Sequence, residues 1–227
     1  MAVKRGYVDY GAGTPVDLRV LEVMKPYFTG SFGNPSSVHS VGQEAKKAVE
    51  ESRKSVADLV GAEMKEEILF TSGATESNNL AIKGVAYRNR DRGNHIITTT
   101  IEHMSVINTF KHLQKEGFKA TYVPVDEYGV VDVEALKSAI TNQTILISVM
   151  YANGEIGTIE PIKEIGEIAH EKSIYLHVDA VAAAGQVPID VTNEHVDLLS
   201  LSSNDIYGPK GVGALYVKTG TKIQPII

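Results

Sequence analysis

Short apolar runs alternate with longer segments of helical spacing along the whole chain. Each run is apolar along most of its length, and polar side chains do not fill every second position. Strands of this kind are buried on both faces, which is typical of parallel sheets covered by helices. The predicted strands are residues 67–70, 95–99, 120–125, 144–149, 173–178 and 198–201.

Helices are predicted between these strands from apolar and small side chains at spacings of three and four. Gly61 is expected to end the first of them, and Pro161 fits the first turn of another. The predicted helices are residues 40–60, 105–115 and 162–171, with a further one that begins after Asp132, a residue type favoured as an N-cap.

The alternation of strands and helices predicts an α/β fold with three layers, in which helices cover both faces of a mostly parallel sheet. Residues 1–35 include a segment rich in glycine and proline, and we interpret them as an N-terminal arm. Residues 36–227 are expected to form one large domain. No repeat, low-complexity tract or interdomain linker interrupts them.

The composition narrows the class of protein. At 227 residues, 43% hydrophobic and 22% charged, the chain fits a soluble globular domain. Its net charge of −6 includes no basic run, which argues against nucleic acid as a partner. No stretch approaches the roughly 18 apolar residues of a membrane span, and no apolar signal core follows Met1. We therefore expect a cytoplasmic protein with no membrane partner.

The chain contains no cysteine, so disulfides and thiolate metal sites are excluded, and we expect no metal site. The first segment that could carry chemistry is residues 70–80, a strand end followed by a small-residue turn and a helix. Exposed amides and hydroxyls at a helix N-terminus suit a phosphate group. An ordinary helix capped by Ser72 or Thr75 is the alternative, and the residues alone leave both open.

Three polar residues stand at predicted strand ends. Asp179 ends an apolar strand, where a carboxylate is costly unless it is paired, although it could simply cap the next segment. His103 follows another strand, and a lone histidine there is commonly structural. Asn153 precedes Gly154, so it fits a tight turn as well as a ligand contact.

Several stretches together resemble the cysteine desulfurases, which are pyridoxal phosphate enzymes of the class V aminotransferase group. The matching stretches are residues 31–39 (SFGNPSSVH), 73–79 (GATESNN), 155–158 (EIGT) and 206–211 (IYGPKG). The resemblance implies the large domain of pyridoxal phosphate fold type I, with a sheet of the seven-stranded type closed by a hairpin over residues 205–217 that turns near residues 208–211. It also implies that the small C-terminal domain is absent from these residues.

The resemblance assigns roles to individual residues. Ala74 and Thr75 would contact the cofactor phosphate, His103 would stack on the pyridine ring and assist proton transfer, and Asp179 would bind the ring nitrogen. The remaining implied cofactor contacts are Asn153, which faces the ring and substrate, and Ser202 and Asn204 at the phosphate end. Ala182 and Gly13 depart from the family, which has glutamine and threonine there.

The most telling departure is Asp205, which occupies the place of the Schiff-base lysine, as in an archaeal type of desulfurase. A carboxylate cannot form an imine, and it adds negative charge beside a phosphate. We therefore expect weak, non-covalent binding of pyridoxal phosphate. Because the chain has no cysteine, no persulfide can form on it.

The leading hypothesis is a lysine-free cysteine desulfurase that transfers sulfur from L-cysteine for iron–sulfur cluster assembly and is inactive as this chain alone. We expect a homodimer or a complementary C-terminal half as the partner, with an iron–sulfur scaffold protein as a further candidate. The alternative hypothesis is a non-catalytic scaffold or relic that binds a desulfurase or a cluster-assembly protein through the old dimer surface.

Overall fold

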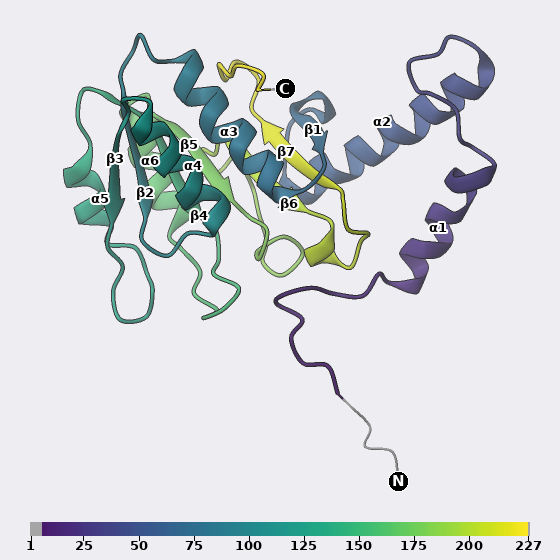
Figure 1. The fold of residues 1–227 in the computed structure, drawn as a ribbon, viewed down its shortest axis with the longest axis horizontal. Coiled ribbons are helices and arrows are strands. Elements are labelled where there is room, and N and C mark those ends of the chain that lie inside the picture. The colour runs from purple at the N-terminus through teal and green to yellow at the C-terminus, as the bar shows by residue number, and fades with distance from the viewer. Residues whose placement is uncertain (1–5, 227) are drawn as a thin grey trace.

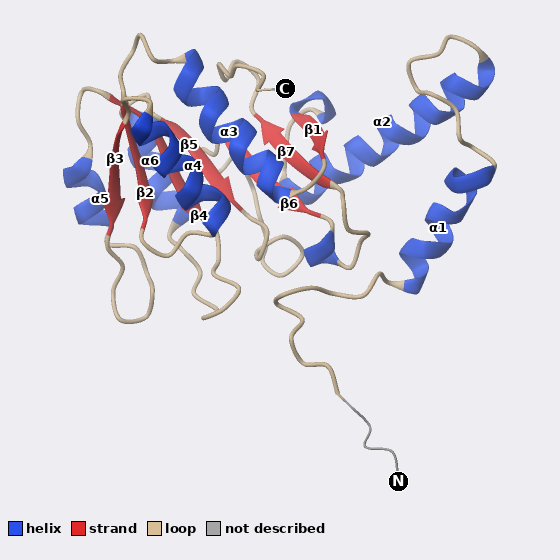
Figure 2. Cartoon of the chain, viewed as in Figure 1, coloured by secondary structure: helices blue, strands red, loops and turns tan. Residues whose placement is uncertain are grey.

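A seven-stranded sheet forms the centre of the computed structural model, which describes residues 6–226 (Figures 1 and 2). Its strand order is β1-β7-β6-β5-β4-β2-β3, and only β7 runs antiparallel to its neighbours. The strands are β1 (Ile68–Thr71), β2 (His95–Thr99), β3 (Lys119–Val123), β4 (Thr144–Met150), β5 (Tyr175–Asp179), β6 (Leu198–Ser202) and β7 (Gly213–Val217). The predicted α/β class with a mostly parallel sheet is confirmed.

Helices cover both faces of this sheet. The helices are α1 (Leu18–Thr29), α2 (Ser40–Val60), α3 (Ala74–Arg88), α4 (Met104–Lys115), α5 (Val133–Ala139) and α6 (Ile162–Glu171), with short 3-10 helices η1 (Lys65–Glu67) and η2 (Asn204–Ile206). One apolar core lies between α3, α4 and the sheet, and the other lies between the sheet, α5, α6 and the C-terminal part of α2. The three-layer prediction is therefore confirmed as well.

The predicted helix boundaries agree closely with the structure. Helix α2 spans the expected residues and ends at Gly61, whose φ of 69° is a left-handed conformation that glycine adopts without strain. Asp132 caps α5 by accepting a hydrogen bond from the Ala135 amide at 2.9 Å. Helix α6 begins one residue after Pro161.

The hairpin predicted over residues 205–217 is wrong in its first half. Strand β6 has already ended at Ser202, and residues 204–206 form the 3-10 helix η2. Tyr207 then takes a left-handed φ of 61°, and the Gly208 amide donates to the Ser203 carbonyl at 2.7 Å. Because these residues close a turn on themselves, they cannot continue a ladder. The antiparallel pair is β6 with β7.

Helix α1 was not predicted, and it lies within the residues interpreted as an arm. None of its residues is buried, and it extends with the start of α2 away from the sheet (Figure 1). Large apolar side chains along it are open to solvent, including Leu18 and Phe28, which are 75% and 68% exposed. This part of the chain therefore presents an uncovered apolar surface.

A buried row of three polar side chains crosses the middle of the sheet. His177 on β5 contacts Ser148 on β4 through Nδ1 at 2.8 Å and Ser200 on β6 through Nε2 at 2.9 Å. All three side chains are fully buried, and burial lowers the pKa of His177 to about 3. The imidazole is therefore neutral at physiological pH.

No helix among residues 6–226 is long and apolar enough to cross a bilayer.

Candidate functional site

A hollow of about 540 Å³ lies at the carboxyl ends of the parallel strands. Its walls come from Gly11 and Ala12 of the arm, the start of α3 (residues 72–76), the loop after β4, and the ends of β4, β5 and β6. Five of the seven predicted cofactor contacts line it, namely Ala74, Thr75, His103, Asp179 and Ser202, and Asp205 lines it too. This edge is the usual place for a ligand in an open α/β sheet.

Asp179 is the last residue of β5 and is only 6% exposed. Its Oδ2 accepts a hydrogen bond from Asn78 Nδ2 at 2.7 Å, and its Oδ1 accepts one from the Val181 amide at 3.1 Å. Burial raises the pKa of this carboxyl, and these two donors act in the opposite direction. A cationic N–H group placed beside it would offset the remaining cost of burying its charge.

His103 caps α4. Its Nδ1 accepts a hydrogen bond from the Ser105 amide at 3.1 Å and lies 2.8 Å from Ser105 Oγ. Ser105 is in turn bonded to Asn78 Nδ2 at 2.8 Å. The predicted pair of His103 and Asp179 is thus joined by two further buried residues that the sequence analysis did not identify. Asn78 belongs to the GATESNN stretch and lies on the buried face of α3. Membership of that stretch was the one sequence feature that could have identified it.

The start of α3 offers free backbone donors. Gly73 occupies the N-cap position without a capping side chain, so neither Ser72 nor Thr75 is the cap considered from sequence. No acceptor for the amides of Ala74 and Thr75 occurs among residues 6–226. Glu76 accepts two hydrogen bonds from Ser72, at 2.6 and 2.7 Å, which lowers its pKa. The helix N-terminus can receive an anion, but a carboxylate already lies beside it.

Negative charge dominates this hollow. Carboxyl groups of Glu76, Glu155, Asp179 and Asp205 line it, and no lysine or arginine among residues 6–226 does. Asp205 also contributes to the raised pKa of Asp179 through like-charge repulsion. The Lys210 amine, 3.3 Å from the Thr14 carbonyl, is engaged elsewhere. An anionic ligand would meet repulsion here, which a lysine at position 205 would reduce.

Two predicted contacts are not among the residues that line the hollow. Asn153 accepts hydrogen bonds from the amides of Glu155 and Ile156 at 2.9 and 3.3 Å, the turn geometry that was its alternative interpretation. Asn204 lies on η2, and its buried Oδ1 has no partner among the described residues. Their roles toward a cofactor stay predictions.

Glu102 was overlooked in the sequence, although it is a charged residue directly before His103. Its Oε1 accepts hydrogen bonds from Thr99 Oγ1 at 2.7 Å and from the Met150 amide at 3.0 Å. It thereby ties the loop that carries His103 to the end of β4. Burial raises its pKa to about 8, the hydrogen bonds from Thr99 and Met150 act against this rise, and the nearby Asp179 adds to it.

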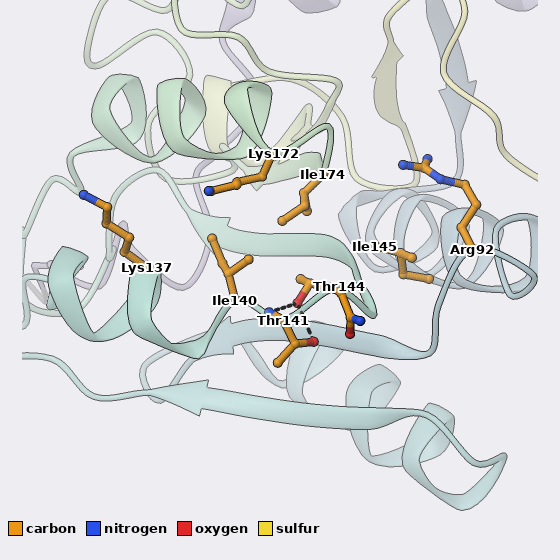
Figure 3. A pocket seen from close by; sticks show the side chains of 9 residues that line it. Arg92, Lys137, Ile140, Thr141, Thr144, Ile145, Lys172 and Ile174 are labelled. Carbon is orange, nitrogen blue, oxygen red and sulfur yellow. Dashed lines mark hydrogen bonds between the residues drawn. The ribbon is translucent and has the colours of Figure 1, made fainter.

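A second hollow, of about 500 Å³, lies at the opposite edge of the sheet, where β4 begins (Figure 3). Its rim carries Arg92, Lys137 and Lys172 around isoleucine side chains. Lys137 lies in the last turn of α5 and Lys172 follows α6, where cations offset the helix dipole. The Arg92 guanidinium donates to the Ser173 carbonyl at 2.8 Å. These roles account for the cations without a ligand.

Comparison with known families gives a match to the aminotransferase class V family over residues 6–227. The chain belongs to this family. Cysteine desulfurase IscS of Clostridium botulinum is 58% identical to this class V chain over 224 residues, which are 99% of the chain and 56% of the relative. Cysteine desulfurase IscS of Methanosarcina thermophila is 56% identical and is covered over 55% of its length.

Solved structures agree with the class V assignment. A NifS-like protein superimposes with a TM-score of 0.95 at 44% identity, covering 98% of the chain and 62% of that structure. The structure titled SspA in complex with cysteine superimposes equally well at 43% identity and is covered over 65% of its length. The sheet is that of the large domain of pyridoxal phosphate fold type I. The chain spans about half the length of the curated relatives it matches.

Proposed function

We propose that this chain supplies the cofactor-binding large domain of a cysteine desulfurase that holds pyridoxal phosphate without a covalent bond. The observation that carries the proposal is the meeting of Asp179, His103 and the free N-terminus of α3 around one hollow. Its reaction would be sulfur transfer from L-cysteine for iron–sulfur cluster assembly in the cytoplasm, with a further polypeptide segment supplying the cysteine. The similarity to IscS proteins supports this substrate.

The donor set fits the cofactor at both ends. Asp179 would hold the protonated ring nitrogen, the His103 ring would stack on the pyridine, and the amides of Ala74 and Thr75 would hold the phosphate, with Ser202 beside them. Bound there, pyridoxal phosphate would supply an electron-withdrawing ring. The chain's own part would be to pair that ring nitrogen with the buried Asp179 carboxylate and to hold His103 in the same hollow.

Titration with pyridoxal phosphate is expected to give weak, saturable binding, because Asp179 and His103 are both present for the ring while Asp205 cannot form an imine. Asp179→Ala should weaken this binding about tenfold or more, since it removes a charge-assisted hydrogen bond. Absorbance or fluorescence titration measures both. Asp197→Ala is the matched control, because Asp197 is a half-buried aspartate directly before β6, at the opposite edge of the sheet.

Treatment of the same samples with borohydride should leave no cofactor on the residue at position 205. Fragment mass spectrometry distinguishes this position from the nearby Lys210. Reduced cofactor found on Asp205, or an affinity unchanged by Asp179→Ala, would contradict the proposed site.

The excess of carboxyl groups in the hollow favours a second candidate function. Within the described part of the chain, four acidic side chains and no lysine or arginine line it, which suits a scaffold that has lost cofactor binding. Such a protein would bind a desulfurase or a cluster-assembly partner through its uncovered apolar surface. A chain that binds no pyridoxal phosphate at millimolar concentration yet retains such a partner would support this alternative.

Self-association, or association with a complementary C-terminal half, is expected from the uncovered apolar surface of α1. Light scattering at micromolar concentration should show a species larger than a monomer. Phe28→Ser should shift it toward the monomer, because Phe28 is one of the apolar side chains that α1 leaves exposed. Tyr128→Ser, at a 70% exposed aromatic in the loop after β3, should not. A stable monomer of the unaltered chain would contradict the expectation.

A further inference from the structure

A continuous chain of hydrogen bonds, buried except at its His103 end, joins Asp179 to His103. Asn78 on α3 donates from Nδ2 to Asp179 Oδ2 at 2.7 Å and also contacts Ser105 Oγ at 2.8 Å. Ser105 Oγ lies 2.8 Å from His103 Nδ1. Asn78 is fully buried and Ser105 is 8% exposed, so water does not compete for these groups. The two side chains bring residues of α3, α4 and β5 into one network.

The chemistry of the donors gives this network a direction. The Asn78 amide nitrogen carries two protons and no acceptor lone pair, so one proton goes to Asp179 and the other to Ser105. Ser105 Oγ accepts that proton, which leaves its own hydroxyl proton for His103 Nδ1. The Ser105 backbone amide, 3.1 Å from the same nitrogen, can only donate. Nδ1 of His103 is therefore an acceptor in both of its contacts.

The orientation of the Asn78 amide is fixed by Asp179. Its Oδ1 is buried and has no partner among the described residues, which is unfavourable. Rotation of the amide would turn that oxygen toward the Asp179 carboxyl group and remove its donor. The observed orientation thus leaves Asn78 Oδ1 unpaired and directs both Nδ2 protons to acceptors, one to Asp179 and one to Ser105.

We propose that Asn78 and Ser105 are positioning residues that hold neutral His103 in the tautomer with its proton on Nε2. Nε2 has no partner among residues 6–226, and His103 lines the hollow, so this N–H is the group left for a ligand. Neutral His103 then gives a proton or a hydrogen bond at Nε2 and does not accept one there. The inference deepens the proposed function, which leaves the direction of proton transfer open.

Capping of α4 is the simpler explanation of the His103 geometry, and it accounts for the Ser105 amide contact alone. It does not require the Ser105 hydroxyl or the buried Asn78. The two explanations differ in what happens when these side chains are removed, because the backbone amide stays in every variant.

Nitrogen-15 NMR of the histidine side chains in the full chain, without cofactor, tests the proposal. At about pH 8 an ordinary histidine is neutral, and His103→Gln identifies the signal of interest. The unaltered chain should show a protonated Nε2 and an unprotonated Nδ1. In Asn78→Ala and Ser105→Ala the excess of this tautomer should fall about five- to tenfold, which is the worth of one hydrogen bond. Ser105→Thr should restore it, because it keeps the hydroxyl.

Asn89→Ala is the matched control. Asn89 is a 2% exposed asparagine at the end of the same helix, where it donates to the Val85 and Lys222 carbonyls at 2.8 and 2.9 Å. It should lose comparable stability and keep the tautomer. A proton on Nδ1 in the unaltered chain, or a tautomer ratio unchanged in both Asn78→Ala and Ser105→Ala, would overturn the proposal. Ser105→Ala decides the matter if Asn78→Ala does not fold.

Pyridoxal phosphate titration of the same samples reports separately on the proposed function. A chain with the Nε2–H tautomer that binds no cofactor would remove the proposed function and leave this inference standing. A chain that binds the cofactor but has the other tautomer would do the reverse.

Discussion

Asp205→Lys is expected to attach pyridoxal phosphate covalently to the chain. The new amine would condense with the cofactor aldehyde, releasing water and forming an imine with visible absorbance. The substitution also replaces a carboxylate with a cation in a hollow that no lysine or arginine of residues 6–226 lines, so the affinity should rise strongly. Absorbance spectra before and after borohydride, with mass spectrometry of position 205, measure the change.

Asp205→Asn is the control for Asp205→Lys. It removes the negative charge without supplying an amine, so it should tighten non-covalent binding and still yield no covalent product. Sulfide release from L-cysteine should remain absent in both variants, because the chain has no cysteine to accept the sulfur. If Asp205→Lys gives no visible band at saturating cofactor, the pocket is disabled for another reason and the scaffold function becomes the better account.

Stability should depend on pH through His177. Burial lowers its folded-state pKa to about 3 from 6.5, so below pH 6.5 the unfolded chain binds a proton that the folded chain does not. The contribution of this residue is present above pH 6.5 and is lost as the pH falls toward 3. Between pH 7 and pH 5 it should amount to a loss of about 2 kcal/mol.

His177→Gln should remove this loss, because glutamine can still bond to Ser148 and Ser200 but takes up no proton. Urea unfolding at pH 7 and pH 5 measures the difference between the variant and the unaltered chain. Glu102 acts oppositely in this range, since its raised pKa makes stability fall as the pH rises from 4.5 to about 8. Glu102 is the same in His177→Gln and in the unaltered chain, so the difference between these two proteins at each pH reports on His177.

The sequence predicted the layers and most elements because their signals are local. Apolar runs mark the buried strands, and Gly61 and Asp132 mark helix ends through their own backbone preferences. Helix α1 was not predicted because glycine and proline are frequent around it and Pro26 lies within it, which indicates a loop, although its apolar and polar side chains do lie on different faces. The hairpin was predicted at the wrong residues because Tyr207 has a left-handed backbone conformation, which its residue type does not predict.

Only the site residues that belong to recognisable sequence motifs could be predicted. Strand-end residues such as Asp179 and His103 stand where ligands collect in this fold, and the structure brings them to one hollow. Asn78, Ser105 and Glu102 were missed because their contacts depend on side chains that are distant in sequence. Asn78 reaches Asp179 across 101 positions, and no periodicity encodes that pairing. The turn at Asn153, in contrast, could be considered from the sequence, because its side chain accepts hydrogen bonds from residues only two and three positions further on.

The row of Ser148, His177 and Ser200 has a consequence for strand alignment. Parallel strands are joined by long crossovers, so no tight turn sets their register as it does in a hairpin. If β4 or β6 slipped by one residue, its serine would move to the opposite face and a ring nitrogen of His177 would lose its buried partner. The hydrogen bonds among the three side chains therefore favour the correct register of the central strands. Met150, Asp179 and Ser202 lie two residues further along the same strands. The contacts that align β4, β5 and β6 thus also fix how those three residues lie beside one another at the hollow.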